Sequence, residues 1–316
     1  MDIMRTLKLL FPKLYVWKCT RNIRRHESML ENEIRDEISK LYKQHLRREL
    51  DWNNLQRYTE KMQWKKIYSI GPLEKMASDK YAVREWVEKK IGSEYLIPIH
   101  GVWERFEDIN FDSLPKRFVM KTTHGSASIV IVKNKDTFDK KYTELMFKVW
   151  MSFDYAFASF EMHYKDIPRR IIVEHYMEDQ YGELRDYKFM CFNGKPYCCW
   201  VDKGRYSDHT RDIFDMNWNL LPFTDCFPNS GENTPRPQNF EKMVEIVTKL
   251  SEDFGHVRVD LYNVDGQIYF GELTFCESSG FANIQPEEYD FRLGEMWNLA
   301  IDCNTTMNKF NEKSIF

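Results

Sequence analysis

The chain has few cysteines, and none of them stands in a pattern that would bind a metal. Its seven cysteines include no C-x-x-C pair, and the eight histidines do not stand at ligand spacing from them. A structural zinc site needs such spacing, and a fully paired disulfide framework needs an even number of cysteines. We therefore expect structural or core thiols in a protein of a reducing compartment.

The sequence also lacks a long hydrophobic run. No apolar stretch approaches the roughly 18 residues that cross a bilayer, and no signal-peptide pattern is present. Residues 1–25 do combine seven Lys and Arg residues with leucine and aromatic side chains, which suits an anionic membrane surface. Pro12 interrupts a single helix there, so packing against the body of the protein is the alternative. We expect a cytoplasmic protein, with peripheral contact at the inner face of the cytoplasmic membrane left open.

A strongly basic composition is absent as well. The net charge of -3 argues against a general nucleic-acid binder, because such proteins usually carry a net basic face. With 316 residues, 42% hydrophobic and 15% aromatic, the chain is expected to fold into two or three packed subdomains.

Residues 257–275 contain two carboxylates, Asp260 and Glu272, in an otherwise apolar stretch with the pattern of a β-hairpin. Acidic side chains are seldom fully buried without a partner, because an uncompensated buried charge costs several kcal/mol. A cation on that face would compensate both acids, and a divalent metal bound through oxygen is the simplest candidate. An edge hairpin whose acids point into water is the alternative.

The turn of this hairpin decides whether the two acids share a face. A two-residue turn at Asp265 and Gly266 would separate them, whereas a three-residue loop at 264–266 with Gly266 left-handed would bring them together. We predict the three-residue loop, because it separates a charged face from an apolar one. The predicted charged face consists of Arg258, Asp260, Tyr262, Ile268, Phe270, Glu272 and Thr274.

The rest of the chain predicts a mixture of helices and strands. Periodicity and capping residues, among them Ser28 with Glu31 and Asp79, predict helices at residues 29–50, 79–91, 142–158 and 240–254. Short apolar runs predict strands at residues 95–99, 118–121, 129–132, 171–176, 189–192 and 197–201, the last two joined by an Asn-Gly turn.

Three further motifs are weak when taken singly. Lys121 ends a predicted strand before the loop T-T-H-G-S-A-S, whose backbone N–H groups and hydroxyls suit phosphate binding without the spacing of a P-loop. Glu174 ends an apolar run, and Asp186 and Lys188 lie two residues apart, hence on one face of an extended segment. An edge lysine and a salt-bridged surface are the ordinary alternatives.

Taken together and in this order, the motifs resemble the ATP-grasp superfamily, specifically its TupA-like branch, associated with bacterial teichuronopeptide and other surface-polysaccharide biosynthesis. The resemblance runs from about residue 61 to residue 293. The segments that carry it are D-K-Y-A-V-R-E-W-V, L-P-K-R-F-V-M-K-T-T-H-G-S, R-I-I-V-E-H-Y-M, L-R-D-Y-K-F-M-C-F-N-G-K-P, and V-R-V-D-L-Y with G-E-L-T-F.

The resemblance implies an α+β ATP-grasp fold, in which the nucleotide is held between two β-sheet subdomains. We expect a helical basic extension at residues 1–55, followed by an α/β subdomain at 56–115. A small lid subdomain at 116–178 and a metal-binding subdomain at 179–316 would complete the chain.

The resemblance also implies ATP and Mg²⁺ as cofactors. By similarity Asp260 and Glu272 bind Mg²⁺. Thr274 stands where the superfamily typically has an Asn ligand, so the resemblance does not decide whether the site binds one metal ion or two. Arg258 and Lys188 are the implied catalytic residues, with Arg258 steadying the transferring phosphoryl group. The implied nucleotide-binding residues are Lys121, His124, Gly125, Ser126, Glu174, Tyr176, Asp186 and Lys188.

The activity that the resemblance implies is carboxylate–amine ligation through an acyl phosphate. The expected partners are a uronic-acid glycan or its precursor and an amino acid or similar amine, bound near residues 202–211 and 277–283. Phosphoryl transfer to a sugar, and a non-catalytic module of a polysaccharide assembly complex, are the alternatives.

Overall fold

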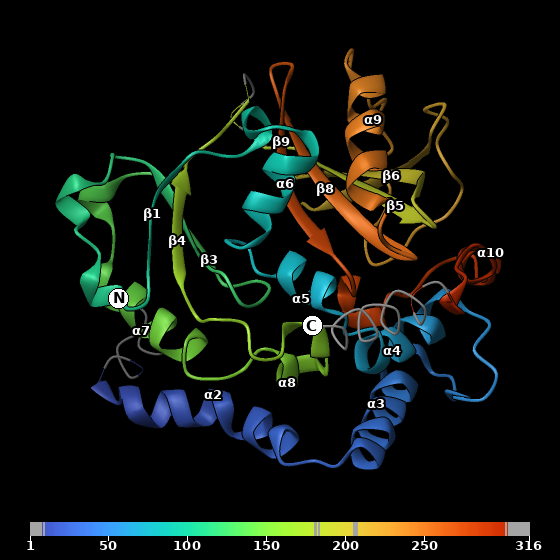
Figure 1. Ribbon diagram of the computed structural model, residues 1–316, viewed down its shortest axis with the longest axis horizontal. Helices are drawn as coiled ribbons and strands as arrows, with labels where there is room; N and C mark the ends of the chain where they lie inside the picture. The colour runs from blue at the N-terminus through green and yellow to red at the C-terminus, as the bar shows by residue number, and fades with distance from the viewer. Residues whose placement is uncertain are drawn as a thin grey trace, which may run out of the picture.

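Two antiparallel sheets, with helices packed around them, make up the described part of the chain (Figure 1). The computed structural model describes residues 8, 10–179, 182, 184–204, 208–300 and 302. Parts of the expected membrane segment, acceptor site and C-terminal subdomain, at residues 1–7, 205–207 and 303–316, lie outside the described residues. Within these residues, each helix is too short or too polar to cross a lipid bilayer.

The smaller sheet has four strands in the order β1-β4-β2-β3. Its strands are β1 (Ile99–Trp103), β2 (Phe118–Thr122), β3 (Ile129–Val132) and β4 (Ile171–His175). Phe118 and Met120 of β2 and Val173 of β4 form a buried cluster with Phe147 of helix α7 (Lys140–Trp150). The smaller sheet therefore has a hydrophobic core of its own.

The larger sheet has five strands in the order β7-β6-β5-β8-β9. Its strands are β5 (Asp186–Phe192), β6 (Lys195–Lys203), β7 (Thr210–Asp215), β8 (His256–Val264) and β9 (Gln267–Thr274). Helix α9 (Phe240–Ser251) lies along this sheet in Figure 1, and its Phe240 and Val247 share a buried cluster with Phe189 and Val259. Burying such side chains contributes about 1.5–3 kcal/mol each, so one face of the sheet forms part of the hydrophobic core.

The hairpin of β8 and β9 brings the two acids together by a different route from the predicted one. Val264 pairs with Gln267, so the turn has two residues, Asp265 and Gly266, and the predicted three-residue loop is wrong. The left-handed conformation of Gly266 is confirmed by its φ of 93°. Asp260 nevertheless pairs directly with Glu272.

A β-bulge at Gly271 accounts for this pairing. The register shifts between Asp260 and Leu261, which pair with Glu272 and Phe270 and leave Gly271 as the extra residue. A Cβ at Gly271 would lie 3.0 Å from the backbone oxygen of Asp260, so a side chain fits poorly there. The bulge also corrects the predicted face: Phe270 and Ile268, expected beside the acids, are buried in the hydrophobic core.

The remaining helices surround the sheets and link them. They are α2 (Pro12–Glu27), α3 (Glu31–Leu46), α4 (Tyr58–Tyr68), α5 (Pro72–Ser78), α6 (Val83–Ile91), α8 (Ala156–Ser159) and α10 (Glu288–Met296). Figure 1 shows α2 along the outer edge of the molecule and α5 and α6 near the junction of the sheets.

Several predicted helix boundaries are wrong. Helix α3 is capped by Glu33, whose carboxylate accepts from the N–H of Leu30 at 2.7 Å, rather than by Ser28 with Glu31. Asp79 accepts instead from the N–H of Tyr81, in a turn that precedes α6.

Two further segments also differ from the prediction. The predicted helix at 142–158 is split into α7 and α8, and in the turn between them the N–H of Ala156 donates to the carboxylate of Asp154 at 3.0 Å. The predicted strand at 95–99 is not formed: Tyr95 ends a short 3₁₀ helix, Ser93–Tyr95, Leu96 makes a single β-bridge with Phe270, and β1 begins only at Ile99.

Candidate active site

One face of the larger sheet carries charged side chains on every strand. Asp202 of β6 pairs with Asp186 of β5 on one side and with Arg211 of β7 on the other. Lys188 of β5 pairs with Asp260 of β8. Side chains at directly paired positions project from the same face, so the register gathers these groups opposite the face that packs on α9.

The candidate metal ligands converge on the guanidinium of Arg258. Its Nε and Nη2 donate to the two carboxylate oxygens of Asp260, each at 2.7 Å. The same Nη2 donates to the hydroxyl of Thr274 at 3.0 Å and lies 3.5 Å from an oxygen of Glu272. Arg258 therefore compensates Asp260 and shares Glu272 with Lys80, and its Nη2 marks the point on which the oxygens of both acids converge.

The charges in this group stabilise one another. Burial would lower the pKa of Arg258, but Asp260 and Glu272 raise it above its ordinary value. Burial raises the pKa of Asp260, while Arg258 and Lys188 act in the opposite direction. Two carboxylates and a hydroxyl are the oxygen donors that Mg²⁺ prefers, so the residues present fit this ion. An ion bound there would compete with Arg258 for the same oxygens.

Lys188 belongs to a second group of buried charges on the same face. Its Nζ lies 2.9 Å from Asp186 and 2.5 Å from Asp202. Arg211 forms two hydrogen bonds to Asp202, at 2.5 and 2.9 Å, and one to Asp225. Burial would raise the pKa of Asp202, but Arg211 and Lys188 hold it well below the usual range. Asp202 thus stays charged and holds the side chains of Lys188 and Arg211 in place.

The smaller sheet contributes Lys121, whose Nζ lies 2.6 Å from Glu174 on the neighbouring strand. Burial would lower the pKa of Lys121, but Glu174, Glu272 and Asp186 raise it. The last two of these acids belong to the larger sheet. Lys121 therefore interacts electrostatically across the junction between the sheets, and its role at the nucleotide stays a prediction.

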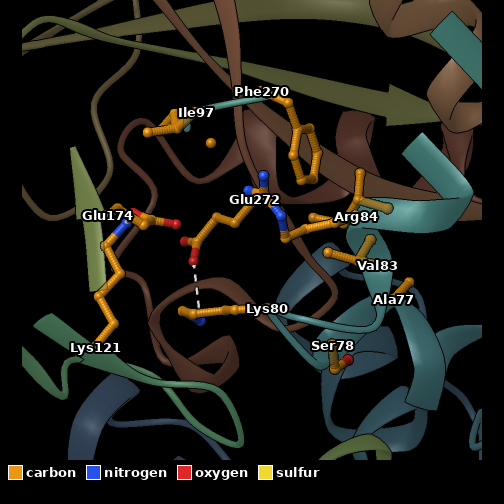
Figure 2. Close-up of a pocket in the computed structure, with 12 residues that line it drawn as sticks. Ala77, Ser78, Lys80, Val83, Arg84, Ile97, Lys121, Glu174, Phe270 and Glu272 are labelled. Carbon is orange, nitrogen blue, oxygen red and sulfur yellow. Dashed lines mark ion pairs between the residues drawn. The ribbon is translucent and has the colours of Figure 1, made fainter. Parts of the chain in front are cut away.

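Lys80 belongs to this junction and was not among the predicted site residues. Its Nζ lies 3.4 Å from Glu272 and donates to the backbone oxygen of Gly125 at 2.9 Å, so it links the metal-site acid to the loop after β2. Figure 2 shows Lys80 reaching toward Glu272, with Lys121 and Glu174 beside them. The D-K-Y-A-V-R segment was used as a helix start and as part of the family resemblance, but no site role was assigned to Lys80.

Two cavities meet at Glu272. The smaller, about 20 Å³, lies between the sheets and is lined by Lys121, Glu174 and Lys80, with Arg84 and Ile97 near them (Figure 2). The larger, about 410 Å³, is open on one side. Its charged and polar lining consists of Ser126, Glu161, Lys188, Asp202, His209, Arg211, Arg258, Glu272, Thr274, Glu277, Ser278 and Ser279. Glu272 lines both cavities, so it stands between the small cavity at the junction of the sheets and the open cavity.

Three of the residues predicted to bind the nucleotide offer no side-chain group to either cavity. His124 is buried with its Nε2 3.1 Å from the backbone oxygen of Trp150, and burial lowers its pKa. Tyr176 lines neither cavity: its hydroxyl donates to Glu178, and its ring lies beneath Arg117. Gly125 contributes only its backbone, and a Cβ there would meet the ring of Tyr155 at 2.7 Å.

Among the described residues, the ligand atoms of Glu161, His163 and Cys276 lie within 4.8 Å of one another, and all three residues are buried. Burial, together with the nearby ammonium groups of Lys65 and Lys66, lowers the pKa of His163 to about 3. The same two ammonium groups would repel a metal cation. This group offers one carboxylate, one imidazole and one thiol, so unlike the oxygens around Arg258 it does not suit Mg²⁺.

Comparison with known proteins gives one extended match. A family model described as TupA-like ATPgrasp matches residues 60–298. This interval contains both sheets and every residue of the two cavities. No curated protein sequence matches the chain.

Solved structures of similar fold are distant in sequence. A D-alanine–D-alanine ligase from Bacillus anthracis has 17% identity and a TM-score of 0.43, over 75% of this chain and 70% of its own. The corresponding ligase from Helicobacter pylori has 13% identity and a TM-score of 0.37, over 71% and 62%. An N5-carboxyaminoimidazole synthetase from Staphylococcus aureus, complexed with ADP, has 14% identity and a TM-score of 0.36 over 63% of this chain. The match spans 44% of that synthetase, less than half of its length.

Proposed function

Because the chain belongs to the TupA-like ATP-grasp family, we propose that it is an ATP-dependent carboxylate–amine ligase. The carboxylate oxygen of one substrate attacks the γ-phosphorus of ATP, giving an acyl phosphate and ADP. A neutral amine then attacks the acyl carbon, and an amide, phosphate and a proton are released. The observation that carries this proposal is the charged face of the larger sheet, where three cations and four acids line or adjoin one open cavity.

ATP and Mg²⁺ are the cofactors we propose. Asp260, Glu272 and the hydroxyl of Thr274 would hold Mg²⁺, which when bound neutralises charge on the phosphates. Lys121 and Lys80 of the smaller cavity are positioned for a phosphate chain that runs along Glu272. Phosphoryl transfer depends mainly on positioning and charge neutralisation, which buried lysines and a buried arginine provide.

The lining of the larger cavity fits two substrates of opposite charge. Arg211 and His209 line it beside Lys188 and suit a carboxylate. Glu161 and Glu277 line it as well and suit an ammonium group. Arg211 is held rigidly, because its guanidinium is bonded to two aspartates and stacked near the ring of Phe227 at 4.9 Å.

Glu277 is the residue that we propose accepts the proton of the amine. It is 3% exposed, and among the described residues its Oε2 has no hydrogen-bond partner. Burial raises its pKa to about 8. A base whose pKa lies near the working pH is suited to deprotonating an ammonium group before it attacks.

The finer parts of the proposal rest on the family. We propose a uronic-acid glycan or its precursor as the carboxylate substrate and an amino acid or similar amine as the nucleophile, in the cytoplasm. We also propose that residues 116–178 act as the lid and residues 179–316 as the metal-binding subdomain, with residues 1–55 as the extension and 56–115 preceding the lid.

An assay of ADP release tests the activity. The protein is incubated with Mg-ATP, a glucuronyl acceptor and a panel of amino acids, and ADP is measured with and without each amine. Amine-dependent ADP release together with a new amide supports the ligase. ADP release that needs no amine and yields a phosphorylated sugar would show phosphoryl transfer instead. Asp215→Asn, on the same sheet outside both cavities, is the control variant.

A further inference from the structure

Exposed apolar side chains are concentrated at the start of α2. Among the described residues nine large apolar side chains are exposed. Four of them lie within eight residues: Leu10 at 64%, Phe11 at 58%, Leu14 at 62% and Trp17 at 48%. The other five are scattered over the chain between residues 30 and 220. Single exposed apolar residues are ordinary, whereas a contiguous group marks an interaction site.

The opposite side of α2 holds the helix on the body of the protein. Thr20 is fully buried, and Ile23 packs against the cluster of α8 and the segment that follows it. The Nδ1 of His26 lies 2.9 Å from the backbone oxygen of Phe157. In Figure 1, α2 lies at the outer edge, with α7 and α8 on one side of it. The exposed apolar side chains are therefore presented outward by an anchored helix.

Basic residues continue the same outward face. Lys18, Arg21 and Arg24 are exposed and follow Leu14 and Trp17 at helical spacing, so they share that side of the helix. Helix α2 carries five Lys and Arg residues against one acid, Glu27, although the whole chain has a net charge of -3.

Apolar and basic side chains on the same face of α2 indicate which kind of partner binds there. A second copy of the chain docked on the same face would bring the two sets of arginines and lysines together, which is unfavourable. A purely apolar ligand would leave the basic residues of the face without a partner of opposite charge. An anionic lipid surface satisfies both halves, because apolar side chains enter the boundary below the headgroups while Lys and Arg contact the phosphates.

We propose that α2 docks the protein on an anionic phospholipid surface through Leu10, Phe11, Leu14 and Trp17, with Lys18, Arg21 and Arg24 at the lipid phosphates. The docking surface lies outside the residues matched by the family model and shares no residue with either cavity. It is independent of the chemistry proposed for the site, and a catalytically inactive protein would still bind.

Vesicle co-sedimentation of the full chain tests this. Vesicles of phosphatidylcholine with one quarter phosphatidylglycerol are compared with vesicles of phosphatidylcholine alone. The parent is expected to bind the anionic vesicles at least 10-fold more tightly, and more weakly as salt is raised. The variants Phe11→Ser/Leu14→Ser/Trp17→Ser and Arg21→Glu/Arg24→Glu are each expected to lose at least 10-fold in binding.

Two controls keep the result interpretable. Ile129→Ser/Leu220→Ser removes apolar side chains that are exposed elsewhere, at 39% and 55%, and is expected to bind as the parent does. Thermal unfolding confirms that each variant folds. Equal binding of the parent to both vesicle types, or an equal loss in the control, would overturn the proposal. Sedimentation velocity tests whether the face binds a second copy of the chain instead. If the parent forms a dimer and Phe11→Ser/Leu14→Ser/Trp17→Ser abolishes it, the face is a dimer interface and the proposal is wrong.

Discussion

The two sheets contribute charge to the junction between them in different ways. On the larger sheet Lys188, Arg211 and Arg258 each contact more than one acid, and Asp202 serves two of these cations. The smaller sheet contributes one close pair, Lys121 with Glu174. Function and stability should therefore be coupled at Asp202, which serves two buried cations, and separable at Lys121 and Glu174.

The largest expected effect is a loss of stability from the larger sheet. Asp202→Ala should lower the free energy of unfolding by about 3–5 kcal/mol, because it leaves Lys188 and Arg211 buried with too few partners. Glu174→Ala on the smaller sheet should cost less, about 1–3 kcal/mol, because Lys121 keeps Glu272 and Asp186 nearby. Urea unfolding of both variants measures the difference, and equal losses would remove the distinction between the sheets.

The metal-site acids should affect activity more than stability. Glu272→Gln should reduce ADP release at least 100-fold, about 2.7 kcal/mol in the barrier, because one of the two proposed carboxylate ligands of Mg²⁺ is lost. Arg258 keeps its two hydrogen bonds to Asp260, so the fold should persist. Steady-state rates and a Mg²⁺ titration measure the effect, and near-parent turnover would exclude Glu272 as a ligand.

The pair on the smaller sheet should be removable without unfolding the protein. Lys121→Met/Glu174→Met should raise the KM for ATP about 10-fold, which is 1.4 kcal/mol, because a phosphate contact is lost. Its free energy of unfolding should stay within about 1 kcal/mol of the parent, because apolar residues of similar size replace a buried ion pair. A collapse of stability in this variant would show that the pair is structural.

The bulge that aligns the acids should tolerate no side chain. Gly271→Ala should cost about 1 kcal/mol of stability and weaken Mg²⁺ binding, because the new Cβ would meet the backbone oxygen of Asp260 at 3.0 Å. Gly266→Asn, in the turn of the same hairpin, is the control, since Asn tolerates that conformation and nothing lies within 4 Å. Comparable effects from the two changes would mean that the bulge has no special role.

The last prediction concerns the pH dependence of stability. The pKa of Glu277 is raised to about 8 by burial, so the folded chain keeps a proton that the unfolded chain releases at the ordinary carboxyl pKa. This contribution to stability is fully present below the ordinary carboxyl pKa and is lost as pH rises toward 8. Glu277→Gln should flatten that slope in unfolding experiments. A slope unchanged in the variant would assign the titration to another group.

The order of the motifs was enough to predict the fold and most of the charged face. Lys121, Glu174, Lys188, Asp260 and Glu272 could be identified because each stands at a strand position where an apolar residue is expected. The family match over residues 60–298 confirms the family assigned from those motifs.

The details that depend on contacts between distant segments could not be predicted. The alternation of apolar and charged residues in the hairpin suggested a longer loop. A bulge at Gly271 and a three-residue turn both place Asp260 and Glu272 on the same face of the sheet, so the pattern does not distinguish them. Asp202 with Arg211, and Lys80 with Glu272, become partners only through strand pairing and the packing before α6. The spacing of these residues along the chain does not by itself specify those contacts.

The central claim is that this face joins a carboxylate to an amine through an acyl phosphate. A glucuronyl acceptor labelled with ¹⁸O in its carboxylate, incubated with Mg-ATP and an amine, tests this directly by mass spectrometry of the released phosphate. We predict one labelled oxygen in each phosphate released with the amide. Unlabelled phosphate, or a phosphorylated sugar that retains both labelled carboxylate oxygens, would contradict the account.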